Sequence, residues 1–179
     1  SETTGTVTVT NAIEVTGSTA QAKAALVTSG SRVEVTDAAV TLDDADNVAI
    51  AATDLSGIGN ITTGTVTASN SIEVQGTGSE VTAALVTAGT LVVAGGASTV
   101  ATVSDLVTAS VGSAIADKNN VTAAFTNGIS DAIANLASTG SITAALTNVK
   151  NDDSNVAITI SDADNTAMTA ADLSAIGSA

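Results

Sequence analysis

Short runs of alternating or β-branched residues recur along the chain and predict β-strands. In TVTVT (6–10) and RVEVT (32–36), valines alternate with threonine, arginine or glutamate, so each run has one apolar and one polar side. This period of two is typical of a half-buried strand. The predicted strands are 6–10, 13–15, 32–36, 66–69, 72–74, 91–93 and 156–160.

Between these runs the sequence predicts short helices that begin with a capping box. In this motif a Ser or Thr hydroxyl accepts from an amide three residues later, and the side chain there reaches back. The four candidates are Ser18 with Gln21, Thr77 with Glu80, Thr102 with Asp105, and Thr169 with Asp172. Each precedes a stretch rich in Ala, Leu, Val and Ile, and glycines follow as helix stops: Gly30, Gly59, Gly89 and Gly177.

The chain repeats with a period of 59 residues. Residues 5–30 return as 64–89 with 15 of 26 positions identical, and residues 44–59 return as 162–177 with 11 of 16 identical. The second offset is 118, which is twice 59. A period of this size is typical of stacked supersecondary units, each too small to bury its own apolar face. We divide the array into units 1–63, 64–122 and 123–179.

The order strand, turn, short helix, glycine and strand favours a βα array with largely parallel strands, two βα coils in each period. We therefore predict an α/β repeat fold, a β-rich solenoid-like array of short strands and short helices. An all-β sandwich with short decorating helices is the alternative. The stretch 95–135 departs most from the pattern, and we expect a degenerate middle or a longer helical patch around ISDAIANLAS (129–138).

Composition agrees with thin stacked layers. Apolar residues make up 44% of the chain, but they are mostly Ala and Val, with Phe125 the single aromatic residue. The net charge is −14, with only Lys23, Arg32, Lys118 and Lys150 as cations. Nucleic-acid binding needs clustered cations or stacking aromatics, so nucleic acid is excluded as a partner. No run of about 18 apolar residues occurs, so we expect no membrane insertion.

Three acidic loops are candidate metal sites, at 42–47, 151–155 and 161–165. Oxygen ligands at alternate positions are what Ca²⁺ prefers, and the first and third loops match in the repeat. The predicted calcium ligands are Asp44, Asp46 and Asn47 and their equivalents Asp162, Asp164 and Asn165. Neither loop has the Gly and closing Glu of an EF-hand. The alternative is that these Asp and Asn residues form turns with solvated side chains.

Enzyme chemistry has little support. The chain has no His and no Cys, which removes the commonest bases, nucleophiles and zinc ligands. A carboxylate pair such as Asp43 and Asp44 could in principle cleave glycosides, but the chain has no Trp or Tyr to form a sugar platform. We predict that the protein is not an enzyme.

The segments GTVTVTNA, TAALVT, VEVTDA and TAADLSAIG resemble the repeats in very large, acidic surface and secreted proteins of marine bacteria and cyanobacteria. The resemblance covers most of the chain and is weakest at 95–135. It implies a secreted or cell-surface location, tandem β-rich units, and a place in a surface layer, adhesin stalk or filament. It implies no catalytic residues.

The function predicted from these observations is structural: an extracellular repeat protein that forms a filament, stalk or surface layer. The alternative is an adhesin-type module that recognises a glycan or protein partner through the acidic loops, with Ca²⁺ as the candidate cofactor. Joining the end of the chain to its beginning gives DLSAIGSA–SETTGTVT, close to the internal junction DLSGIGNITTGTVT. We therefore expect head-to-tail contact with a second copy, or with adjacent repeats of a longer chain.

Overall fold

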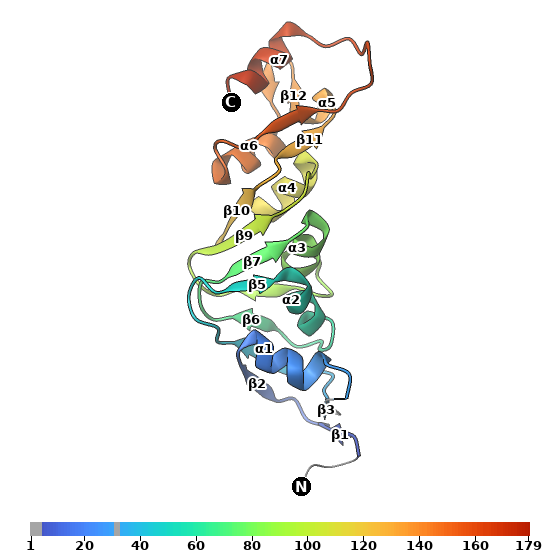
Figure 1. Ribbon diagram of the computed structural model, residues 1–179, viewed down its shortest axis with the longest axis vertical. Coiled ribbons are helices and arrows are strands. Elements are labelled where there is room, and N and C mark those ends of the chain that lie inside the picture. Colours follow the sequence, from blue (N-terminus) through green and yellow to red (C-terminus); the bar gives the residue numbers. More distant parts are fainter. Residues whose placement is uncertain (1–4, 31–32) are drawn as a thin grey trace.

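The computed structural model describes residues 5–30 and 33–179, and it is an elongated, mixed α/β molecule (Figure 1). Strand β1 (Val7–Thr8) and helix α7 (Ala170–Gly177) lie at opposite ends of the long axis. The chain runs along this axis from its described N-terminal strands to its C-terminal helix, and several short sheets and short helices follow one another on the way. We call a stretch of short strands and the helix that follows it a coil.

Fourteen short strands and seven short α-helices form in the described residues. The strands are β1 (Val7–Thr8), β2 (Glu14–Gly17), β3 (Val33–Glu34), β4 (Ala39–Leu42), β5 (Ala49–Ala51), β6 (Val66–Ala68), β7 (Glu73–Gly76), β8 (Val92–Ala94), β9 (Thr99–Val103), β10 (Val121–Phe125), β11 (Ile129–Asp131), β12 (Ala137–Ser138), β13 (Ser141–Ile142) and β14 (Ile158–Ile160). The helices are α1 (Thr19–Ala22), continued by a π-helical turn η1 (Lys23–Val27), α2 (Ala52–Gly59), α3 (Gly78–Leu85), α4 (Ala109–Ala116), α5 (Ile133–Leu136), α6 (Ala144–Asp152) and α7 (Ala170–Gly177).

The strands form parallel ladders, as expected for a βα array. The two largest sheets have the orders β2-β4-β6-β8 and β10-β9-β7-β5, and all their pairs are parallel. In the first sheet Val40 lies beside Val66, and Val66 beside Val92. Among the described strands only β12 and β13 pair antiparallel. The structure is thus mixed α/β, and the all-β sandwich is not the arrangement found.

The copies of the sequence repeat do not occupy the same sheet. Strands β2 and β7 are equivalent in the 59-residue period, yet β2 lies in the first large sheet and β7 in the second. Their local contacts are nevertheless the same. Glu14 accepts from the Thr41 hydroxyl across the strand pair at 3.3 Å, and Glu73 accepts from Thr102 at 3.1 Å. One 59-residue period therefore takes the chain from β2 past β4 to β6 in the first large sheet, and then on to β7 in the second.

All seven predicted strands overlap strands of the structure, although their burial differs from the prediction at the first run. Val7 is 43% exposed, whereas its equivalent Val66 is 1% exposed. The reason is the number of neighbours, because β6 lies between β4 and β8 while β1 pairs with β3 alone. Arg32, which was expected to face outward from the third run, lies outside the described residues.

Two of the four predicted capping boxes are complete. The Ser18 and Thr77 hydroxyls accept from the amides of Gln21 and Glu80, and those side chains accept in return from the cap amides at 2.9 and 2.8 Å. Thr169 caps α7, but its hydroxyl also donates to the Asp172 carboxylate at 2.7 Å. The Thr169 hydroxyl and the Gly140 N–H hold the pKa of Asp172 below its ordinary value.

The capping box predicted at Thr102 is wrong. Thr102 lies inside β9, and α4 begins seven residues later at Ala109, with Thr108 as its N-cap accepting from the Val111 amide. Thr108 lacks a Glu or Gln at its third following position, so the motif could not identify it. Helices α2 and α7 do end at Gly59 and Gly177, although each glycine is the last helical residue and does not follow the helix.

The stretch 95–135 is neither degenerate nor mainly helical. It contains β9, α4, β10 and β11 in the same order as the other coils. The helix expected around 129–138 shrinks to the four residues of α5, held between β11 and β12. Residues 129–131 pair with β14, and this parallel pairing overrides their helical context.

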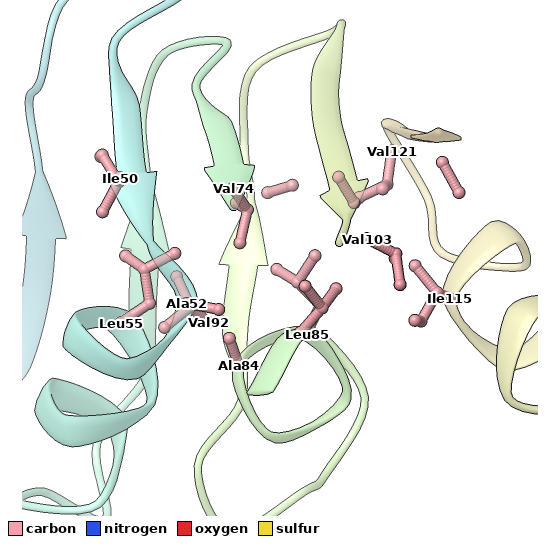
Figure 2. Close-up of a cluster of buried hydrophobic side chains, with 14 of the residues drawn as sticks. Ile50, Ala52, Leu55, Val74, Ala84, Leu85, Val92, Val103, Ile115 and Val121 are labelled. Carbon is pink, nitrogen blue, oxygen red and sulfur yellow. The ribbon is translucent and has the colours of Figure 1, made fainter. Parts of the chain in front are cut away.

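The core is a continuous layer between the strands and the helices. Figure 2 shows Ile50, Val74 and Val103 from successive strands beside Leu55, Leu85 and Ile115 from successive helices. Ile50 is 6% exposed, and the other five side chains are each at most 3% exposed. Each coil therefore buries its apolar residues against the next coil, which explains why small side chains suffice.

The capping box of α3 should make stability depend on pH. The Thr77 N–H, aided by its hydroxyl, holds the pKa of the Glu80 carboxyl below its ordinary value of 4.5. The stabilisation is therefore present above pH 4.5 and is lost as the pH falls through the lower, folded-state pKa. Glu80→Gln should keep the hydrogen bond, as Gln21 does in α1, and lose the titration. We expect the midpoint of urea unfolding of the wild type to approach that of the variant on acidification. Parallel pH curves for the two proteins would contradict this.

Candidate functional site

The predicted calcium ligand Asp44 caps a helix of the preceding coil. One of its carboxylate oxygens accepts from the Thr19 backbone N–H at 2.8 Å and from the Thr19 hydroxyl at 2.6 Å. Thr19 is the first residue of α1, where the backbone N–H has no partner within the helix. A negative charge at this end is also favoured by the helix dipole.

The same contact recurs along the molecule. Aspartates at a strand end or just after one accept from the first backbone N–H of a helix in the coil before. The pairs are Asp105 with Gly78 of α3 at 2.6 Å, Asp131 with Ala109 of α4 at 3.1 Å, and Asp162 with Ile133 of α5 at 2.7 Å. We call these, with Asp44 and Thr19, the inter-coil caps. Helices α1, α3 and α4 are therefore capped twice, by their own Ser or Thr and by an aspartate of the next coil.

A sequence signal for the inter-coil caps exists, although our sequence analysis missed it. In each case the aspartate comes two residues after an apolar strand residue, in the segments LDD, VSD and ISD that end at Asp44, Asp105, Asp131 and Asp162. Asp131 is 8% exposed and accepts three hydrogen bonds, the others from the Ala132 N–H and the Asn135 amide. Because the buried Asp131 carboxylate accepts these three hydrogen bonds, we assign it a structural role.

The remaining ligands of the first loop contact the following coil. The Asp46 carboxylate accepts from the Ser71 N–H at 2.9 Å, and the Asn47 N–H donates to the Ser71 carbonyl at 2.7 Å. Asn47 and its equivalent Asn165 have φ angles of 61° and 62°, the left-handed conformation that Asn tolerates in turns. The loop at 42–47 is thus bonded to the coil below through Asp44 and to the coil above through Asp46 and Asn47.

The equivalent loop at 161–165 keeps the contact with the preceding coil and lacks the contacts with a following coil. Asp162 caps α5, whereas no hydrogen bond in the described part of the chain involves the Asp164 side chain. In the middle loop, Asp152 and Asp153 accept from the Ala123 and Phe125 amides of β10 at 2.7 and 2.9 Å. Within residues 5–30 and 33–179, no three His, Cys, Asp or Glu side chains gather as a metal-binding group.

The calcium site stays a prediction, and the contacts also differ from the alternative of solvated turn residues, because most carboxylates of the acidic loops accept from backbone N–H groups. If the carboxylates already accept from backbone donors, calcium should add little. We expect the same thermal midpoint with calcium and with a chelator at constant ionic strength. Saturable binding to the native state alone would instead stabilise by about 2.7 kcal/mol at a hundredfold excess over Kd. A midpoint that rises with calcium but not with equal magnesium would restore the predicted site.

The second candidate feature is the exposure of single apolar side chains near the two ends of the molecule, although Val48, Leu91, Val93 and Leu106 between the ends are also 36–54% exposed. At the N-terminal end Val7 and Ile13 are 43% and 36% exposed, and at the C-terminal end Leu173 is 43% exposed. Their equivalents inside the array, Val66, Ile72 and Leu55, are at most 3% exposed. We call residues 5–26 the N-terminal face and residues 158–177 the C-terminal face.

Comparisons with protein-family models, with curated proteins and with solved structures found no match. No helix in the described residues is long and apolar enough to cross a bilayer.

Proposed function

We propose that the protein is a structural repeat module, a solenoid-like stack of βα coils that forms an extracellular filament, stalk or surface layer by head-to-tail stacking. The observation that carries the proposal is the contrast between residues of the two faces and their buried equivalents inside the array. Repeat stacks need polar capping units at their ends for solubility, and inside the array a further coil covers the same positions.

Composition and charge support the same function. The core is one continuous cluster of mostly small apolar residues that runs from Ala22 to Val156, as expected if a further unit can be added to it. A net charge of −14 keeps the sides of such a particle apart while the apolar ends associate. The adhesin alternative has less support, because carboxylates of the acidic loops accept from neighbouring backbone donors.

Small-angle scattering and sedimentation velocity over a concentration series test this function. We expect an elongated particle at low concentration and assemblies that grow in length at constant cross-section as the concentration rises. The contact is heterologous, so growth should be open-ended unless the rotation closes a ring. A particle with an axial ratio near one, or one that stays monomeric at every concentration, would overturn the proposal.

A further inference from the structure

The way in which one end meets the other can be read from a junction inside the molecule. Residues 40–59 form the coil beneath residues 64–85, and they are joined by two strand pairs and one helix pair. Strand β4 pairs with β6, β5 pairs with β7, and α2 packs on α3. The lower coil is equivalent to 158–177 by an offset of 118, and the upper coil to 5–26 by an offset of 59.

Both terminal faces have an open strand edge where the internal junction has a partner. In the described residues β1 pairs only with β3, and β14 pairs only with β11. Their equivalents β6 and β4 each have neighbours on both sides. Likewise β2 pairs only with β4, whereas its equivalent β7 pairs with β9 on one side and β5 on the other.

The segment equivalent to β5 is present but is not a strand. Residues 49–51 of β5 correspond to residues 167–169 in the repeat, and residues 167–169 have no regular secondary structure. Met168 is half-buried, while its equivalent Ile50 is 6% exposed beside Val74. A three-residue strand needs a neighbour to form, and β5 has β7 as its single neighbour. The lack of a strand at 167–169 therefore agrees with the lack of a neighbouring strand there.

We propose that residues 158–177 of one copy stack beneath residues 5–26 of a second copy in the register of the internal junction. This inference rests on the proposed function and specifies its contact. Ile158, Thr159 and Ile160 would pair with Val7, Thr8 and Val9 of the second copy. Ala167, Met168 and Thr169 would form a strand beside Glu14, Val15 and Thr16, and α7 would pack on α1 and η1.

The acidic loop then has a defined role at the contact. Inside the molecule the Asn70 side-chain amide donates to the Asp44 carbonyl at 2.8 Å, and the Asp46 carboxylate accepts from Ser71. The equivalents of Asn70 and Ser71 are Asn11 and Ala12. Asn11 of the second copy would therefore donate to the Asp162 carbonyl. The Ala12 N–H would donate to Asp164, the carboxylate that has no hydrogen-bond partner in the described chain.

Engineered cysteines test the register directly, because the natural chain contains no cysteine. One variant carries Ala167→Cys and the other carries Glu14→Cys; both positions are exposed in the single chain. The internal equivalents Ala49 and Glu73 are direct partners, which places their Cα atoms within disulfide range. We expect mild oxidation of the mixture to give mainly the mixed disulfide dimer. The matched control replaces Glu14→Cys with Thr16→Cys, displaced about 6.6 Å along the strand.

The outcomes separate this inference from the proposed function. Assembly with the mixed 14–167 dimer and little 16–167 product supports the register. If the protein assembles but the 16–167 dimer forms as readily as the 14–167 dimer, or more readily, the proposed register is wrong and the structural function still stands. Absence of both assembly and cross-linking overturns both.

A pair of alanine variants gives an independent readout. Asp46→Ala removes an internal contact and should lower the unfolding midpoint of the single chain. Asp164→Ala should leave that midpoint unchanged and raise the concentration at which assembly is half complete. An Asp164→Ala variant that assembles like the wild type would overturn the proposed contact of this carboxylate.

Discussion

Replacing Gly59 by alanine should destabilise the protein strongly, whereas the same change at Gly177 should not. A Cβ atom at Gly59 would lie 2.2 Å from the Thr90 carbonyl oxygen and 2.7 Å from its carbonyl carbon. Both are backbone atoms of the next coil, and Thr90 is itself held by a hydrogen bond from its hydroxyl to the Ala83 carbonyl. The clash cannot be relieved by a side-chain rotation, so we expect a loss of about 3 kcal/mol, the upper part of the range for overpacking.

Gly177 is the matched control because it is the repeat equivalent of Gly59 at the end of an equivalent helix. No atom lies within 4 Å of a Cβ added there. Gly177→Ala should therefore change the free energy of unfolding by between zero and about 1 kcal/mol in the stabilising direction, since alanine favours helix. Urea unfolding followed by far-UV circular dichroism measures both variants. Equal losses of stability in the two variants would show that the backbone at Thr90 does not pack closely against Gly59.

Local signals in the sequence predicted the elements that depend on local contacts. The boxes at Ser18 and Thr77 need only residues three positions apart, and the structure has both. The alternating runs predicted strands because a period of two reports one buried side. Of the seven strands that were missed, β9 and β10 have Ala101 and Ala123 at inward positions, and these small side chains weaken the alternation.

The features that the sequence could not reveal are those set by contacts between coils. The shift of β2 and β7 into different sheets depends on how far each coil advances, which no local motif encodes. The inter-coil caps join residues 22–29 positions apart, so Asp44 resembles a metal ligand until its partner Thr19 is placed beside it. The same pattern of carboxylates thus fits either calcium binding or hydrogen bonding to backbone N–H groups. In the structure, backbone N–H groups already donate to Asp44 and Asp46.

Replacing Leu55 by alanine should be the other severe change. Leu55 is fully buried in α2, among side chains that include Ala52 and Val92 (Figure 2). Removing a side chain at such a site loses its transfer free energy and leaves a cavity, which together cost about 2–5 kcal/mol. Thermal unfolding should show a large fall in the midpoint with secondary structure retained at low temperature.

Leu173→Ala is the control for this variant and also links stability to assembly. Leu173 occupies the equivalent position in α7 but is 43% exposed, so its truncation should change the stability of the single chain by no more than about 0.5 kcal/mol. If a second copy covers α7 as α3 covers α2, the loss should appear in association instead. We expect Leu173→Ala to unfold like the wild type and to assemble only at higher concentration. An unaltered assembly curve would mean that this leucine stays exposed in the filament, and the C-terminal face would then not be the surface that stacks.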